Sequence, residues 1–131
     1  MIINDSKSTS LSSTKLLLES FENIYWIVGG LAKKGDKLNL HKKYFDKIRA
    51  YIYGKDRIFF SNILLNKIKH SVLRTLNDSI KLVFQDLNKI NERKKIILFS
   101  PSAASFDQFE NFETRGLYFN KIIKKYIKKI N

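Results

Sequence analysis

The sequence contains no cysteine and only two histidines. The absence of cysteine excludes a disulfide framework, a thiolate zinc site and a cysteine nucleophile. The histidines, His41 and His70, are too few and too isolated to indicate a metal cluster. We therefore expect each histidine at the surface or at its boundary, and we expect no metal site.

Long apolar runs are also missing. No run approaches the ~20 residues that a membrane-spanning helix needs, and the start of the chain, Met1–Asp5, lacks the charged and apolar regions of a signal peptide. The sequence therefore predicts a cytoplasmic protein without a membrane partner.

Acidic residues are scarce. The sequence has 12 acidic and 25 basic residues, which gives a net charge of +13. Twenty of the basic residues are lysines and five are arginines, whereas nucleic-acid-binding proteins usually rely on arginine for bidentate contacts. Abundant lysine, isoleucine and asparagine are typical of an AT-rich bacterial genome. We expect no nucleic-acid partner, although the surplus charge would still attract small anions.

The 131 residues are enough for one domain with an ordinary core. Apolar runs predict strands at Met1–Ile3, Ile24–Val28, Ala50–Tyr53, Ser71–Arg74 and Ile96–Phe99. Helical spacing of apolar residues predicts helices at 10–21, 40–48, 55–68, 76–90 and from 114 to the end. This alternation predicts an α/β fold, a mostly parallel, Rossmann-like sheet with helices on both faces.

The last of these helices is amphipathic and basic. Apolar residues such as Phe119, Ile122 and Ile123 alternate at helical spacing with lysines. A helix of this kind can bind a membrane or a partner. In an α/β alternation we expect it to pack on the sheet, with its lysines in solvent.

Small and polar residues follow three of the expected strands. The segments are Asp5–Thr9, Gly29–Lys33 and Ser100–Asp107. Parallel strands bring their carboxyl ends to one rim, and open α/β sheets bind ligands there. The three segments are therefore expected to converge on one crevice.

The residue types in these segments favour an anionic ligand. Asp5, Lys7 and Thr9 precede a helix whose amino terminus attracts anions, and Lys33 offers a second cation. No phosphate-binding loop of the form G-x-x-x-x-G-K-[ST] occurs anywhere in the sequence. Phosphate-loop chemistry by this chain alone is not expected.

The segment 100–116 resembles the signature of one family, roughly S-P-A-x-A-S-x-D-x-F-x-N-F-x-x-R-G. The matching residues are Ser100, Pro101, Ala104, Ser105, Asp107, Phe109, Asn111, Phe112, Arg115 and Gly116. The start Asn4–Ser10 is similar to the family's N-D-S-K-A-T-N, with serine at positions 8 and 10, and 29–33 is similar to its G-G-x-x-K. The chain resembles the carboxyl-terminal domain of the UDP-N-acetylmuramoylalanine–D-glutamate ligases of the Mur ligase family.

The resemblance implies a function. These ligases add D-glutamate to UDP-N-acetylmuramoyl-L-alanine in peptidoglycan synthesis, and ATP activates the acceptor as an acyl phosphate. Carried over residue by residue, the resemblance assigns D-glutamate binding to Thr9, Lys33, Ser105, Phe106 and Phe112. It implies that Asp5 and Lys7 contact the nucleotide, ATP or ADP, when the domains of the ligase close. It assigns no catalytic residue to this domain alone.

The family's other two domains carry the UDP site and most of the ATP and Mg²⁺ site. We expect residues 1–131 to be a single carboxyl-terminal domain, monomeric and without ligase activity on its own. Two alternatives remain open. The chain could be the equivalent domain of another Mur ligase or of folylpolyglutamate synthase, although the Ser105–Gly116 pattern argues against both. It could also be a free-standing module that binds anions or nucleic acid.

Overall fold

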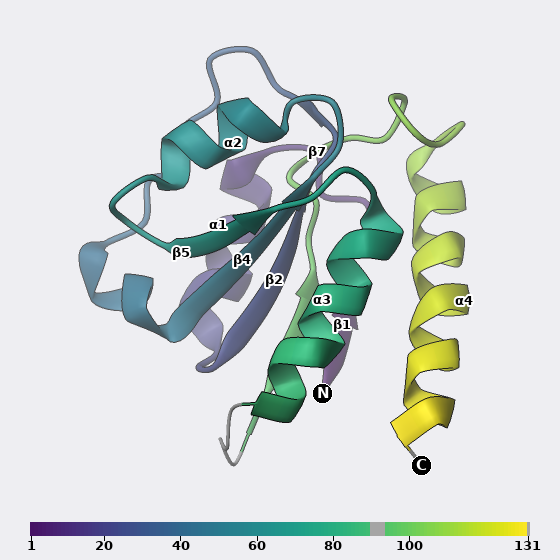
Figure 1. Cartoon of the computed structure of the whole chain (residues 1–131). Coiled ribbons are helices and arrows are strands. Elements are labelled where there is room, and N and C mark those ends of the chain that lie inside the picture. The colour runs from purple at the N-terminus through teal and green to yellow at the C-terminus, as the bar shows by residue number, and fades with distance from the viewer. Residues whose placement is uncertain (90–93, 131) are drawn as a thin grey trace.

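The computed structural model describes residues 1–89 and 94–130, and within these residues it contains a five-stranded parallel sheet (Figure 1). The strands are β1 (Ile2–Asn4), β2 (Ile24–Gly29), β4 (Ile48–Tyr53), β5 (Lys69–Val72) and β6 (Ile96–Phe99). Their order is β1-β6-β2-β4-β5, and every pairing in this sheet is parallel. The predicted α/β fold with a parallel sheet is confirmed.

Helices cover both faces of the sheet (Figure 1). They are α1 (Leu11–Ser20), the 3₁₀ helix η1 (Lys42–Lys47), α2 (Arg57–Leu64), α3 (Leu76–Lys89) and α4 (Phe112–Ile130). The core on one face draws on α1 and α2, and the core on the other draws on α3 and α4. Among the described helices, none combines the length and the apolar character needed to cross a membrane.

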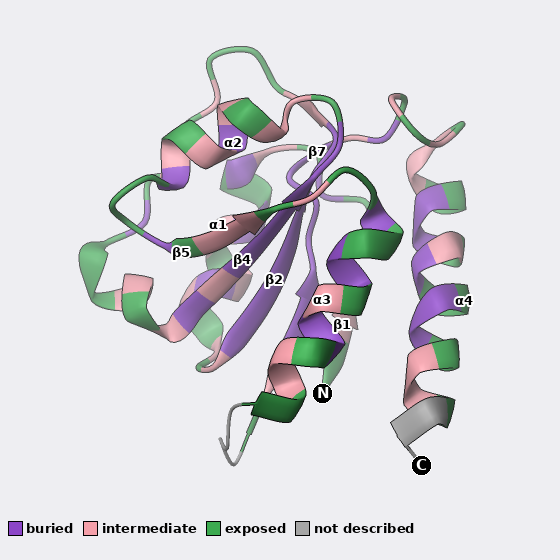
Figure 2. Cartoon of the chain, viewed as in Figure 1, coloured by how far each residue is buried: buried purple, intermediate pink, exposed green. Residues whose placement is uncertain are grey.

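The central strand β2 is buried along its whole length, as Figure 2 shows. Alternate residues of a strand point to opposite faces. Trp26 and Val28 therefore enter one core, and Tyr25 and Ile27 enter the other. A strand covered on both faces must be apolar throughout, which is why the run 24–28 is uninterrupted.

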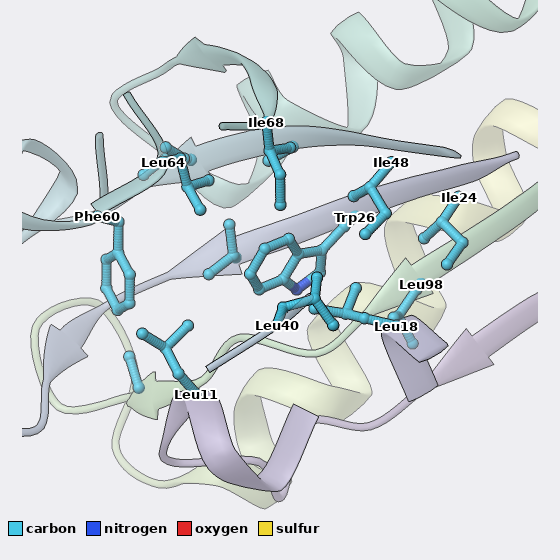
Figure 3. Close-up of a cluster of buried hydrophobic side chains, with 14 of the residues drawn as sticks. Leu11, Leu18, Ile24, Trp26, Leu40, Ile48, Phe60, Leu64, Ile68 and Leu98 are labelled. Atoms are coloured by element: carbon cyan, nitrogen blue, oxygen red, sulfur yellow. The ribbon is translucent and has the colours of Figure 1, made fainter. Parts of the chain in front are cut away.

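Trp26 lies at the centre of the first core, among Leu11, Leu18, Leu40 and Phe60 (Figure 3). The residue is fully buried, so its indole N–H needs an acceptor. The indole nitrogen donates to the carbonyl of Ser100 over 2.7 Å. The largest side chain of this core thus fixes the backbone just beyond β6.

Helix α4 packs on the second core through stacked rings. The rings of Phe119 and Phe99 are 4.4 Å apart between centroids, and Tyr126 stacks on Phe84 at 5.1 Å. The lysines at positions 121, 124, 125 and 128 are exposed. The expected packing of this helix on the sheet is confirmed.

Two predicted helices are shorter than expected. The segment 40–48 forms only η1, because the His41 side chain accepts a hydrogen bond from the Lys43 N–H and Ile48 joins β4. Helix α2 ends at Leu64, where the chain turns through Asn66 with a left-handed φ of 60°. The next strand, β5, consequently starts and ends two residues before the predicted 71–74.

The remaining helix boundaries shift slightly. Helix α4 begins at Phe112, two residues before the expected start, since the Asn111 side chain caps it by accepting from the Thr114 N–H over 2.7 Å. The predicted end of α3 at Ile90 lies outside the described residues. A second sheet was not predicted. It pairs β3 (Leu31–Ala32) with β7 (Ala103–Ala104) in antiparallel orientation.

Candidate functional site

The three polar segments meet at the carboxyl end of the sheet. The Asp5 N–H donates to the Phe99 carbonyl over 2.7 Å, and the Gly29 N–H donates to the Pro101 carbonyl over 2.9 Å. Strand β3, from the second segment, pairs with β7 from the third. The predicted convergence of the segments on one rim is therefore confirmed, and we call this region the rim.

Two glycines allow the segments to approach one another. Gly29 and Gly30 have φ values of +148° and +124°. A Cβ atom at Gly29 would lie 2.0 Å from the Tyr53 carbonyl oxygen, and one at Gly30 would lie 2.4 Å from the Ala104 oxygen. The chain can therefore pass from β2 to β3, against β4 at Gly29 and against β7 at Gly30, only where side chains are absent.

A chain of buried hydroxyls joins the first and third segments beneath the rim. The hydroxyl of Thr14, on α1, is 2.6 Å from those of Ser100 and Ser102 and 2.8 Å from that of Ser8. Ser100 in turn donates to the Asp5 carboxylate over 2.8 Å. Every hydroxyl in this cluster has a partner, which makes a buried polar network stabilising.

Arg115 joins the segments more directly. The residue is fully buried on α4, and its guanidinium donates to the Ala103 carbonyl over 2.8 Å and to the Ser6 hydroxyl over 3.1 Å. It also donates to the carbonyls of Ser6 and Ser8. Burial lowers the pKa of Arg115, an effect that nearby Tyr53 and Asp107 partly offset.

Gly116 lets α4 approach the first segment closely. A Cβ atom at Gly116 would lie 3.1 Å from the Ser6 Cβ atom, and the Gly116 carbonyl accepts a hydrogen bond from the Asn4 side chain over 3.0 Å. The Arg-Gly pair at the end of the sequence pattern therefore locks helix α4 onto the Asp5–Thr9 segment. Both residues match the sequence pattern, but the pattern by itself indicates no role for either.

The residues predicted to bind D-glutamate all lie at the rim. Thr9 is exposed next to Ser10, which caps α1 and so leaves the Thr9 hydroxyl uncommitted. Lys33 is exposed directly after β3, and Phe106 keeps 70% of its surface exposed. Lys33 follows β3, and Ser105 follows β7. Because the two strands are antiparallel, these residues lie at opposite ends of the two-stranded sheet.

Two potential donors at the rim are not used within the described residues. Ser105 is buried, at 2% exposure, yet its hydroxyl has no hydrogen-bond partner in that part of the chain. The N–H of Phe112 stands at the first position of α4, where a helix cannot supply an acceptor.

The residues predicted for the nucleotide differ in their surroundings. Lys7 is exposed, whereas Asp5 is half-buried and accepts from Ser100. The amino terminus of α1 offers less to an anion than the sequence suggested, because the Asp36 carboxylate already accepts from the Leu11 N–H over 2.7 Å. No group of three or more possible metal ligands occurs in residues 1–89 and 94–130.

Comparison with known proteins shows relatives that match nearly the whole chain. No family model matches it. The UDP-N-acetylmuramoylalanine–D-glutamate ligase of Wolbachia sp. subsp. Brugia malayi is 40% identical over 126 residues, which are 95% of this chain and 25% of the ligase. The resemblance to the D-glutamate ligases is confirmed. The ligases of Rickettsia bellii and Rickettsia felis are 38% and 37% identical, over 91% and 97% of the chain.

The chain spans about a quarter of the length of these D-glutamate ligases, with 25%, 26% and 28% of the three relatives covered. This share is consistent with one domain of a larger ligase, the carboxyl-terminal one that the sequence pattern indicated. The rim, where Arg115 and the glycines hold three segments together, is built largely from the residues of that pattern.

Proposed function

We propose that this chain is the amino-acid-binding domain of an ATP-dependent ligase that adds D-glutamate to UDP-N-acetylmuramoyl-L-alanine in peptidoglycan synthesis in the cytoplasm. The observation that carries the proposal is the convergence of the three segments at one rim. Relatives named as D-glutamate ligases match the chain over nearly its whole length and support the choice of substrate.

The small β3–β7 sheet supports a grip on a dicarboxylate. Lys33 follows one strand of this sheet, and Ser105 follows the other at the opposite end. Three residues of strand span about 10 Å of backbone, and the long Lys33 side chain shortens that gap. Two anion-binding groups held at a fixed separation select the length of a dicarboxylate, and fixing its orientation lowers the entropic part of the barrier.

The partners of each carboxylate follow from these positions. Lys33 and Thr9 would hold the α-carboxylate of D-glutamate. The Ser105 hydroxyl and the Phe112 N–H would hold the side-chain carboxylate, since neither has a partner within the described residues. Phe106 would line the pocket with its exposed ring.

The nucleotide would approach the same rim from the rest of the ligase. Lys7 is exposed and could contact a phosphate, and the half-buried Asp5 could accept from a ribose hydroxyl. Bound ATP supplies the activation of the acceptor carboxylate as an acyl phosphate, and Mg²⁺ and UDP would be held by other domains. This domain presents the glutamate amine to the activated carboxyl group.

An NMR titration of the chain tests the glutamate site. D-glutamate should cause saturable shifts in the amides of Lys33, Ser105 and Phe112, and L-glutamate should bind more weakly because its amine or one carboxylate is misplaced. Lys33→Ala should weaken binding by about tenfold or more. The matched control is Lys34→Ala, an exposed neighbour that should bind as the unmodified chain does. Equal responses to both enantiomers, or shifts away from the rim, would refute the assignment.

A further inference from the structure

A hollow of about 530 Å³ opens beside the rim, beyond the carboxyl ends of β4 and β5. Three basic side chains line it, those of Lys55, Arg57 and Arg74. Phe106, Asp107 and Gln108, from the segment between β7 and α4, form its other wall. Figure 1 shows the loops after β4 and β5 and this segment gathered at the same end of the sheet. We call this hollow the basic pocket.

Hydrogen bonds between the three walls hold the basic pocket open. The Lys55 N–H donates to the Asp107 carboxylate over 2.9 Å, and the Gln108 side chain donates to the Arg74 carbonyl over 3.0 Å. The Gly54 N–H also donates to the Arg74 carbonyl, over 3.3 Å. These hydrogen bonds within the protein preform the pocket, which reduces the entropic cost of binding.

Gly54 forms the floor of the basic pocket, and the position admits only glycine. Its φ is +90°, and a Cβ atom there would lie 2.7 Å from the Asp107 carboxylate oxygen. The carbonyl of Gly54 accepts from the Arg57 guanidinium over 2.9 Å. This bond orients the guanidinium and still leaves it other N–H groups to donate.

Three basic residues and one acidic residue, Asp107, line the basic pocket, so positive charge is in excess there. Within the part of the chain that the structure describes, no carboxylate lies within 4.0 Å of the charged groups of Lys55, Arg57 or Arg74. Of the carboxylates nearby, Asp107 accepts from the Lys55 backbone, and Asp56 accepts from the Ala32 N–H over 2.8 Å. Three cations around one preformed hollow attract an anion of matching charge.

We propose that the basic pocket binds a phosphate group, free or carried as a phosphate ester, at a site next to the proposed glutamate site, with which it shares Phe106. A tetrahedral dianion accepts hydrogen bonds on several sides at once, and arginine offers a planar pair of donors to it. The Thr75 hydroxyl and the Gln108 amide add neutral donors to the lining. The exposed ring of Phe106 gives an ester's organic part an apolar surface.

The test is an NMR titration of the chain with sodium phosphate, with sodium chloride at equal ionic strength as the reference. Phosphate should give saturable shifts in the amides of Gly54, Lys55, Thr75 and Gln108. The double variant R57Q/R74Q should weaken binding by at least about tenfold. A parallel titration with glycerol phosphate distinguishes an ester from the free ion, because only the ester should also shift Phe106.

The matched control removes two charges from a different hollow. A depression of about 440 Å³ at the other end of β4 and β5 is lined by Lys67 and Lys69, among other residues. The variant K67Q/K69Q lowers the net charge of the chain by the same amount and should bind phosphate within about twofold of the unmodified chain. If R57Q/R74Q fails to fold, the single variant R74Q decides, because the Arg74 side chain is exposed and makes no bond among the described residues.

Three results would overturn this inference. Equal weakening by both double variants would mean that phosphate responds to net charge alone. Amide shifts scattered over the lysine-rich surface on addition of phosphate, or no shifts at all, would also contradict a specific phosphate site. D-glutamate that shifts the Arg74 and Gln108 amides would show that the basic pocket belongs to the glutamate site. The glutamate proposal can fail without the phosphate proposal. That would be the result if D-glutamate left the amides of Lys33 and Ser105 unshifted while phosphate still bound in the basic pocket.

Discussion

Replacing Arg115 by methionine should lower the free energy of unfolding by roughly 3 kcal/mol or more, because it leaves buried carbonyl groups without donors. The guanidinium satisfies the carbonyls of Ser6, Ser8 and Ala103, and methionine keeps much of its volume but none of its N–H groups. For a chain of this size, the melting temperature should fall by roughly 10 °C or more. Thermal and urea denaturation followed by circular dichroism measure both quantities.

Two further variants separate the hydrogen bonds from the charge. R115K keeps a cation without the planar arrangement of donors, and it should recover only part of the loss. K121M, at an exposed position of the same helix, should change stability by less than about 0.5 kcal/mol. A loss below about 1 kcal/mol for R115M would show that water or backbone shifts satisfy the carbonyls, and Arg115 would not be what holds the rim together.

Lys33→Ala in a full-length ligase that carries this sequence should lower kcat/KM for D-glutamate by about one to two orders of magnitude. The variant removes a charge-assisted contact to a carboxylate, worth roughly 1.5–3 kcal/mol, and each 1.4 kcal/mol corresponds to a factor of ten. The melting temperature should not change, because Lys33 is exposed and its side chain has no partner among the described residues. Steady-state kinetics with varied D-glutamate provide the measurement.

Ser105→Ala should cost less than Lys33→Ala, since it removes a neutral donor and leaves the Phe112 N–H in place. Lys34→Ala is the control for charge at the rim, and its kinetics should match those of the unmodified ligase. Unchanged glutamate kinetics for Lys33→Ala, or a lowered melting temperature with unchanged kinetics, would mean that these residues serve the structure and not the substrate.

The sequence was sufficient to predict the parallel sheet and the convergence of the three polar segments at one rim. Each buried strand is a short apolar run, and the run 96–99 coincides with β6. Three of the strands, β1, β2 and β6, are each followed by a polar segment. Because parallel strands run in one direction, the sequence predicted that these three segments would meet. The direction of the strands determines where these segments meet, whatever the packing of the side chains.

The contacts that hold the rim together could not be predicted in the same way. Strands β3 and β7 have two residues each, too few for any periodicity. The role of Arg115 depends on carbonyl groups in two different segments. The Ser6 carbonyl is more than 100 residues away in the chain, and the Ala103 carbonyl is 12 residues away. A partial signal did exist for Thr14, which occupies a helical position between Leu11 and Leu18 on the buried face of α1.

The strand order also determines when the rim can form. Asp5 and Ser100, which share a hydrogen bond, are 95 residues apart in the chain. Within the described residues, β1 lies at the edge of the sheet and pairs only with β6. Contacts between such distant segments form slowly during folding, because a long loop must close first. During synthesis, β2, β4 and β5 leave the ribosome long before Arg115 does. We therefore expect the rim to assemble last, with helix α4 completing it.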